Sequence, residues 1–340
     1  MHDSPSQPSL EFRIPLSPSD SMMRMVRYFL ESIQEFGGPI GKSAHCALVV
    51  GDETPPFDLR ETYPWMNDHD MSVHWVDQEN FAKWKYDATG FERFWVESRA
   101  DVVAMIDADL LVTGDFDDVI LQAHRDQTIL GVIAHVSPFG RTNSDGRPSA
   151  AWWQDIFDAA GVDMPPLEFE CSAWGINFRT IPGFERTNII FGDEAHRYGP
   201  AYFNAGVVIG PRAHFDTMGR TFVDDLTLVH RFQQTHFAYQ MAHPVCCARH
   251  GFRCETIPVD YNFALNIPTD LYRSLNPGPD GPGTHEDTRI FHYIGGGKYF
   301  TGEDAVDELI ENGRDDGAWP VFRARLGRVR ERIRQQDSRP

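Results

Sequence analysis

Two aspartates, one residue apart, directly follow an apolar run in the sequence. The run Val102–Ile106 predicts a buried strand, and Asp107 and Asp109 leave its carboxyl end. In open α/β sheets, ligands bind outside the carboxyl ends of the strands. A tight turn there would bring both carboxylates to one hard cation, because such ions prefer carboxylate oxygen. On its own, the Asp-x-Asp pattern is equally consistent with a loop carrying two solvated side chains.

A histidine, three glycines and a lysine form a second group. Residues 289–293 predict a strand that carries His292, and Gly295, two more glycines and Lys298 follow it. Backbone N–H groups of a glycine-rich loop can approach an anion, and a lysine adds a point charge. Considered separately, a histidine in such a place is more often a packed or surface residue than a metal ligand, and the lysine is more often a surface residue than a phosphate ligand.

A third group opens the strand expected over residues 203–209. Asn204, Ala205 and Gly206 precede its apolar part. The glycine allows another group to approach the backbone closely, and the asparagine amide can contact sugar hydroxyls. The structural alternative is a turn in which the asparagine side chain bonds its own backbone.

The segments that position these groups alternate between strands and helices. We expect strands over residues 10–15, 46–50, 72–76, 102–106, 128–134, 203–209, 253–259 and 289–293, and helices over 21–36, 89–98, 117–123, 221–236, 238–250 and 318–336. Such alternation predicts an α/β fold with a mostly parallel sheet and helices on both faces.

The chain divides by composition into three parts. We expect a flexible, Pro/Ser-rich tail over residues 1–9 and a single domain over 10–312 with two halves, 10–135 and 136–312. Residues 136–200 hold short strand-like pieces and are interpreted as substrate-facing. Residues 274–288 read as a loop. The Arg-rich tail over 313–340 predicts a helix with charge on most faces, either solvated or an interaction surface.

Composition excludes several classes of partner. The chain has 340 residues, 31 basic and 50 acidic, for a formal charge of −19. Such a surface repels a phosphate backbone, which argues against nucleic acid. We see no signal peptide and no apolar stretch long enough for a membrane span. The five scattered cysteines lack zinc-type spacing and fit reduced thiols in a cytoplasm. A homo-oligomer is left open.

Together, and in this order, the three groups resemble family 8 of the glycosyltransferases, the relatives of glycogenin and of bacterial galactosyltransferases. That family's pattern is an apolar strand with Asp-x-Asp, then Phe-Asn-Ala-Gly-Val, then His-x-x-Gly-x-x-Lys. The resemblance spans roughly residues 44–300. It implies a GT-A (nucleotide-diphospho-sugar transferase) fold, with a Rossmann-like, mostly parallel mixed sheet. In such a domain, residues 10–135 would be the nucleotide-binding half and residues 136–312 the acceptor-side half. It also implies transfer of a hexose, with UDP-hexose as the default donor, to an acceptor hydroxyl of unknown identity, with retention of configuration.

The resemblance also assigns roles to residues. Asp107, Asp109 and His292 would hold Mn²⁺ or Mg²⁺, and a mixed carboxylate and imidazole set favours Mn²⁺. Gln240, on the helix after the Phe-Asn-Ala-Gly strand, would act in catalysis. Donor binding would fall to the two aspartates together with Arg93, Asn204, Ala205, Gly206, Gly295 and Lys298.

The sequence departs from the family at several places. Tyr299 and Phe300 follow Lys298 where the family commonly has Pro-Trp, and Tyr239 stands where an aspartate often precedes the glutamine. The loop that binds the base is ambiguous between residues 15–20 and 51–55.

Three other functions compete with this interpretation. A sugar-nucleotide nucleotidyltransferase would show a Gly-rich basic loop after the first strand, which is not seen. A haloacid-dehalogenase-like phosphatase needs Thr or Val where Leu111 stands. A non-catalytic nucleotide-sugar-binding relative would bind a donor without cleaving it.

Overall fold

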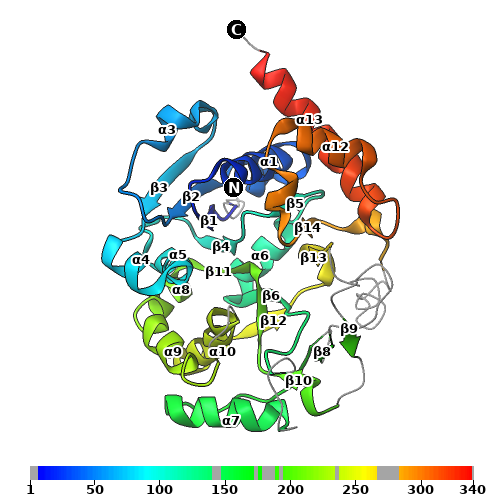
Figure 1. Ribbon diagram of the computed structural model, residues 1–340. Coiled ribbons are helices and arrows are strands. Elements are labelled where there is room, and N and C mark those ends of the chain that lie inside the picture. Colours follow the sequence, from blue (N-terminus) through cyan, green and yellow to red (C-terminus); the bar gives the residue numbers. More distant parts are fainter. Residues whose placement is uncertain are drawn as a thin grey trace, which may run out of the picture.

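The centre of the protein is a seven-stranded sheet with strand order β12-β6-β11-β4-β1-β2-β3 (Figure 1). The computed structural model describes residues 7–139, 147–171, 175–177, 188–190, 194–233, 237–265 and 283–338. Six strands of this sheet run in one direction and β11 opposes them. Its strands are β1 (Leu10–Leu16), β2 (His45–Val50), β3 (Met71–Trp75), β4 (Val102–Ile106), β6 (Ile129–Ile133), β11 (Phe203–Pro211) and β12 (Cys254–Thr256). The predicted mostly parallel α/β fold is confirmed.

A smaller sheet sits at the carboxyl edge of the large one. It joins β13 (Phe263–Ala264), β14 (Ile290–His292) and β5 (Leu110–Val112), and β14 runs antiparallel to β5. This register sets His292 opposite Leu110, immediately after the Asp-x-Asp turn. The sheet therefore brings together groups that are far apart in the sequence. Two further pairs of strands are β7 (Phe169–Glu170) with β10 (Tyr198–Gly199) and β8 (Gly175–Asn177) with β9 (Asn188–Ile190).

Helices pack on both faces of the large sheet (Figure 1). One face is covered by α1 (Asp20–Phe36), α2 (Pro39–Lys42), α3 (Leu59–Thr62), α6 (Asp117–Asp126), α12 (Glu303–Asn312) and α13 (Trp319–Asp337). The other is covered by α4 (Gln78–Trp84), α5 (Tyr86–Glu92), α7 (Ser149–Ala160), α8 (Arg212–Met218), α9 (Phe222–Val229) and α10 (Ala238–His250).

The two layers follow from the alternation of side chains along each strand. In β2, Cys46, Leu48 and Val50 face the α1 layer, while Ala47 and Val49 face the α10 layer. A strand buried on both faces must be apolar throughout, which explains the unbroken apolar runs in the sequence.

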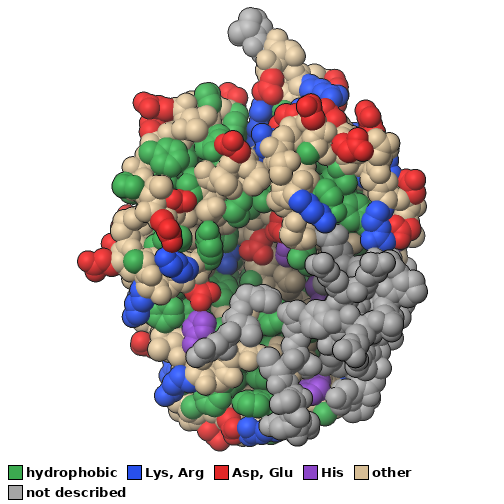
Figure 2. Space-filling model, in the orientation of Figure 1, with side chains coloured by type: hydrophobic (Ala, Val, Ile, Leu, Met, Phe, Trp, Pro, Cys, Tyr) green, Lys and Arg blue, Asp and Glu red, His purple; other side chains and the backbone are tan. Residues whose placement is uncertain are grey.

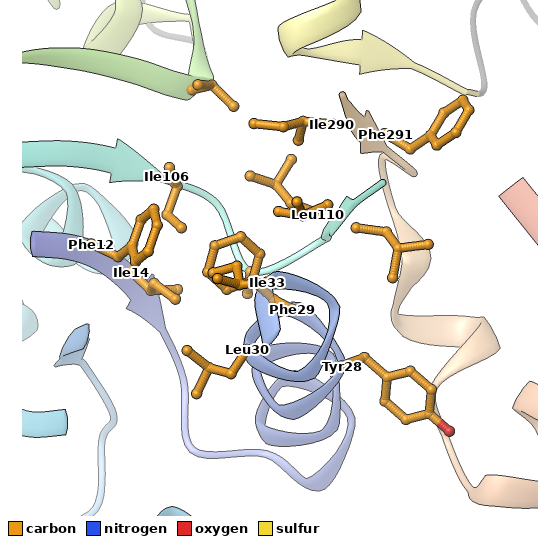
Figure 3. Packing of buried hydrophobic residues seen from close by; sticks show 14 of the residues in the cluster. Phe12, Ile14, Tyr28, Phe29, Leu30, Ile33, Ile106, Leu110, Ile290 and Phe291 are labelled. Atoms are coloured by element: carbon orange, nitrogen blue, oxygen red, sulfur yellow. The ribbon is translucent and has the colours of Figure 1, made fainter. Parts of the chain in front are cut away.

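Figure 3 shows the α1 layer at close range. The ring of Phe12 on β1 meets that of Phe29 on α1 edge to face, with centroids 5.3 Å apart. Ile106, the last residue of β4, lies close to this packing (Figure 3). The strand end that leads into the Asp-x-Asp turn therefore rests on a close-packed core.

The sequence predicts a C-terminal helix with charge on most faces, either solvated or an interaction surface, but one face of this helix is apolar and buried within the protein. The helix itself is present as α13, but it packs against α1 and α12. Its apolar positions recur every three or four residues, the spacing of one helix face. The buried apolar residues are Trp319, Phe322, Leu326, Val329 and Ile333. Several of its arginines pair with acidic side chains, as Arg330 does with Asp307 at 2.8 Å.

Other expected elements differ in their limits. The helix over 89–98 is α5 followed by the 3-10 turn Arg93–Trp95, and that over 221–236 ends at Val229, with 234–236 outside the described residues. Residues 136–200, read as strand-like pieces, also hold the helix α7. Most of the expected tail and of the loop 274–288 lies outside the described residues, although Ser9 donates to Asp101 through both its N–H and its hydroxyl. Within the described ranges no helix has both the length and the apolar character needed to cross a bilayer.

Candidate functional site

Asp107, Asp109 and His292 meet at the carboxyl edge of the large sheet. One potential ligand atom from each lies within 4.8 Å of the others. The His292 Nε2 atom is 3.2 Å from Asp109 Oδ1 and 3.9 Å from Asp107 Oδ2. Among the residues that the structure describes, this is the only group of three His, Cys, Asp or Glu side chains with such geometry. Two carboxylates and an imidazole suit a divalent cation such as Mn²⁺.

Backbone hydrogen bonds from three strands fix this arrangement. The Asp107 N–H donates to the Gly206 carbonyl at 3.1 Å, which ties β4 to the start of β11. The Tyr293 N–H donates to the Asp109 carbonyl at 3.1 Å, which ties the turn to β14. The position of each ligand is thus set by sheet register rather than by a free loop.

Gly206 leaves room for the histidine ring. A Cβ at this position would lie 2.5 Å from His292 Cε1 and 2.6 Å from Nδ1, closer than real contacts allow. Its N–H donates to the Asn204 Oδ1 at 2.9 Å, so the asparagine forms the turn that was the structural alternative. The group that approaches this glycine closely is the imidazole of His292, and contact of Gly206 with a donor stays a prediction.

Asn262 orients the histidine, and sequence reasoning missed it. Its Oδ1 lies 3.0 Å from His292 Nδ1, and the side chain is fully buried. Since an amide oxygen only accepts, Nδ1 carries a proton and Nε2 faces the two carboxylates. Nε2 donates to Asp109 when the ring is cationic, and its lone pair can bind a cation when the ring is neutral. Asn262 follows the short 3-10 turn Val259–Tyr261, 30 positions before His292. No local pattern marks it.

The charges in the cluster are strongly interdependent. Burial raises the pKa of Asp107, and Asp109 adds to this, while His292 and Arg93 oppose it. For Asp109, burial also acts to raise the pKa, but His292 and the hydrogen bonds from His292 and Gly295 outweigh it, so the pKa is lowered. For His292, burial acts to lower the pKa, but the two aspartates outweigh it, so the pKa is raised. The carboxylates of Asp107 and Asp109 thus share one cationic partner, the imidazolium of His292. A bound divalent cation would balance the charge of both carboxylates.

A cleft of about 340 Å³ opens over the cluster. In the space-filling view a hollow lies near the centre of the molecule, with acidic and histidine side chains in it (Figure 2). Gln240 lines the cleft from α10, and its Oε1 accepts from the Ala205 N–H at 3.4 Å. The full lining is Asp107, Asp109, Ala134, His135, Val136, Asn204, Ala205, Gly206, Phe237, Gln240, His292 and Ile294.

His135, two residues after the end of β6, is a further lining residue that the sequence did not indicate. Burial, with a smaller contribution from His292, lowers the pKa of His135 to about 3. The imidazole is therefore neutral at physiological pH, and it is a weak base.

Three of the predicted donor-binding residues do not line the cleft: Arg93, Lys298 and Gly295. Arg93 is 2% exposed, and its guanidinium bonds to the carbonyls of Gly90 and Ile106 and to the Tyr239 hydroxyl. Lys298 is exposed, with its Nζ 4.6 Å from the centroid of its neighbour's ring, Tyr299. Direct contact of any of the three with a donor stays a prediction.

Gly295 has a structural role at the cluster. It adopts the left-handed conformation, with φ of 72°, and its N–H donates to Asp109 Oδ2 at 3.1 Å. The sequence predicts that backbone N–H groups of this loop contact an anionic ligand. In the structure the Gly295 N–H instead donates to a carboxylate of the protein, that of Asp109.

The strand order also bears on the two candidate base-binding loops. β1 is the neighbour of β4, and β2 is one strand further away. Neighbouring strands lie about 4.8 Å apart. The loop 15–20, after β1, therefore begins one strand away from the Asp-x-Asp turn, and the loop 51–55, after β2, begins two strands away. Both open at the same edge of the sheet.

The solved structures that resemble this protein include those of three glycosyltransferases. The galactosyltransferase LgtC, in complex with donor and acceptor sugar analogs, is 12% identical, with 95% of each chain covered and a TM-score of 0.51. The bifunctional glycosyltransferase WbbM is 13% identical with a TM-score of 0.47, covering 95% of this chain but 52% of the other, so this chain spans about half of that protein. Mouse xyloside xylosyltransferase 1 is 11% identical with a TM-score of 0.46, covering 84% of this chain and 98% of the other.

The likeness to LgtC establishes the fold. The protein has the GT-A fold that the sequence resemblance implied. The other two TM-scores lie below 0.5. No protein-family model and no curated protein sequence matches the chain.

Proposed function

We propose that this protein is a metal-dependent glycosyltransferase that transfers a hexose from a nucleotide-diphosphate sugar to an acceptor hydroxyl. One observation carries the proposal: Asp107, Asp109 and the oriented His292 converge at the carboxyl edge of a GT-A sheet, on the floor of a cleft. In open α/β sheets this edge is where ligands bind. Fold alone does not give function, so the proposal rests on the chemistry of the cluster.

The cluster fits a divalent cation. The carboxylates of Asp107 and Asp109 and the Nε2 of His292 would hold Mn²⁺ or Mg²⁺, with the mixed donor set favouring Mn²⁺. Asn262 would keep the imidazole in the tautomer that a metal requires. When bound, such an ion supplies Lewis-acid stabilisation of the leaving diphosphate.

The donor would lie along the carboxyl edge of the sheet. Its diphosphate would sit at the cluster, and its base and ribose would extend over the end of β1, which is the strand next to β4. We therefore favour the loop 15–20 over 51–55 for the base. Lys298 would turn its exposed side chain to the diphosphate, and Asn204, Ala205 and Gly206 would lie beside the sugar. UDP-hexose is the donor we propose to test first.

The cleft favours transfer with retention. An inverting transferase needs a general base on the acceptor side. The only carboxylates lining the described part of the cleft are Asp107 and Asp109, and the low pKa of His135 makes it a poor base. Gln240 is neither base nor good nucleophile, but its amide can hydrogen-bond the sugar or acceptor. The acceptor oxygen would then bond the anomeric carbon on the face that the phosphate leaves, and the departing phosphate oxygen would take the acceptor's proton.

A panel of nucleotide-sugars tests the proposal. Each is added with and without Mn²⁺, and the melting temperature is measured, since a ligand that binds the native state raises it. Release of the nucleoside diphosphate is then followed for each donor that binds. We expect a Mn²⁺-dependent shift and slow release with at least one UDP-hexose. Binding without release would indicate a non-catalytic relative, and pyrophosphate formation from a nucleoside triphosphate and a sugar phosphate would indicate a nucleotidyltransferase.

A further inference from the structure

Arg93 is buried next to the end of β4, where the Asp-x-Asp turn begins. Its NH1 donates to the carbonyl of Ile106 at 3.3 Å, the residue immediately before Asp107. Its NH2 donates to the Tyr239 hydroxyl at 3.0 Å, and the guanidinium carbon lies 5.3 Å from the centroid of that ring. The arginine therefore links the end of β4 to the first turn of α10.

Tyr239 is held in the same buried place by a second contact. Its hydroxyl donates to the Gly90 carbonyl at 3.2 Å, and its ring covers the position where Gly90 lacks a side chain. A Cβ on Gly90 would lie 2.8 Å from the ring carbon Cε2. The ring of Tyr239 on α10 thus packs directly on Gly90 of α5, and Tyr239 stands where family 8 often has an aspartate.

Tyr239 and Gln240 are consecutive on one helix and point to different places. Successive side chains on an α-helix are separated by about 100° around its axis. Gln240 accordingly lines the cleft, whereas Tyr239 is buried against Arg93. One turn of α10 therefore carries a cleft residue on one side and the contact to the metal-binding strand on the other.

We propose that Arg93 and Tyr239 are a positioning pair, which acts on the cation site through the Ile106 carbonyl and touches neither donor nor acceptor. This rests on the proposed function, because it assumes that Asp107 and Asp109 bind a cation. The pair fixes the distance and orientation between the carboxyl end of β4 and the first turn of α10. It therefore fixes the position of Asp107, which follows β4, relative to Gln240 on α10. It replaces the direct contact between Arg93 and the donor sugar that the sequence resemblance implied.

The test substitutes Tyr239→Phe, which keeps the ring over Gly90 and removes one hydroxyl. Mn²⁺ binding is titrated by the electron paramagnetic resonance signal of the free ion, and the affinities for UDP and for UDP-hexose are measured at saturating Mn²⁺. The substitution removes both hydrogen bonds of this hydroxyl, to Arg93 and to Gly90. Only the bond from Arg93 links to β4, and for its loss we expect Mn²⁺ affinity to fall about three- to tenfold. The affinities for UDP and UDP-hexose should fall by equal factors, because the lost contact is not to the sugar.

A matched control is Tyr28→Phe, which also removes a hydroxyl, bonded to Glu303 at 2.7 Å, from a buried ring in the opposite layer. It should leave Mn²⁺ affinity unchanged. Gly90→Ala, which displaces the Tyr239 ring, should reproduce the effect of Tyr239→Phe. In a cycle with Arg93→Lys, the double variant should lose little more than the worse single variant.

The outcomes separate this inference from the proposed function. A wild-type protein that binds no Mn²⁺ contradicts the proposed metal site. A wild-type protein that binds Mn²⁺, with a Tyr239→Phe variant that binds it equally well, contradicts the positioning pair. Loss of affinity for UDP-hexose alone, with Mn²⁺ and UDP unaffected, would show that Arg93 contacts the sugar and would also overturn the inference.

Discussion

Gly206→Ala should displace the histidine of the cluster without unfolding the protein. The added Cβ would stand 2.5 Å from His292 Cε1, whereas ordinary contacts begin at 3.4 Å, so the ring must retreat by about 0.9 Å. The ring is 5% exposed and bonded to Asn262, which leaves it little room. Metal–ligand distances tolerate only about 0.2 Å. We therefore expect Mn²⁺ affinity to fall at least about tenfold, in line with the 10–100-fold cost of disturbing groups that orient metal ligands.

The measurement compares Gly206→Ala with Gly210→Ala, the same substitution further along β11. A Cβ on Gly210 would lie 3.2 Å from side-chain atoms of Ile129 and Phe215, a tight contact remote from the cluster. Both variants should lose stability, by about 1–3 kcal/mol for overpacking. Only Gly206→Ala should lose Mn²⁺ affinity and activity. Equal Mn²⁺ affinity in the two variants would refute the argument that Gly206 is there to admit the imidazole.

Four further predictions follow from the site and its surroundings. Asn262→Leu should lower Mn²⁺ affinity about 10–100-fold by releasing the imidazole tautomer, and an unchanged titration would contradict that role. Lys298→Ala should lower kcat/KM roughly 10–150-fold, as for one charge-assisted contact, and wild-type kinetics would make Lys298 a surface lysine. Gln240→Ala should slow transfer without lowering the melting temperature, and proton NMR of the fresh product should show the donor's α configuration; a β coupling would overturn the retaining mechanism. His243 is buried, and neither of its ring nitrogens has a hydrogen-bond partner among the described residues, so His243→Leu should stabilise the protein by about 1–3 kcal/mol at pH 7.

The His243 prediction has a definite pH dependence. Burial, with a smaller contribution from Arg93, lowers the pKa of His243 from 6.5 to about 3. Below pH 6.5 this histidine is therefore protonated in the unfolded chain but stays neutral in the native protein. The free energy of unfolding falls progressively from pH 6.5 down to about 3. Urea unfolding across that range should show a smaller fall for His243→Leu than for wild type. A parallel pH dependence in both proteins would contradict the argument.

Most of the fold could be predicted because its strands are buried on both faces. Val102–Ile106 is apolar throughout, so its place in the sheet and the exit of Asp107 at its carboxyl end follow from the sequence. The burial of one face of α13 could also have been predicted, since its apolar residues recur every three or four positions. The many arginines between them led us to expect a charged, exposed helix, but those arginines pair with acidic residues on neighbouring elements.

The residues that support the site could not be predicted in the same way. Asn262 reaches His292 through a short irregular segment whose course depends on β13 and β14 pairing. The burial of Arg93 depends on Tyr239, a residue 146 positions away, and on the missing side chain of Gly90. Such contacts are set by tertiary packing, and neither periodicity nor local motif encodes them.

The central claim is that Asp107, Asp109 and His292 bind a divalent cation that the transfer of a sugar requires. The most direct measurement follows nucleoside diphosphate release from the donor selected in the nucleotide-sugar panel, in Mn²⁺, in EDTA and after Mn²⁺ is restored, for wild type and for Asp109→Asn. We predict release that EDTA abolishes and Mn²⁺ restores in wild type, and none in Asp109→Asn, whose melting temperature should stay near that of wild type because the residue sits at a strand end. Full activity of wild type in metal-free buffer, or of Asp109→Asn in Mn²⁺, would contradict the claim.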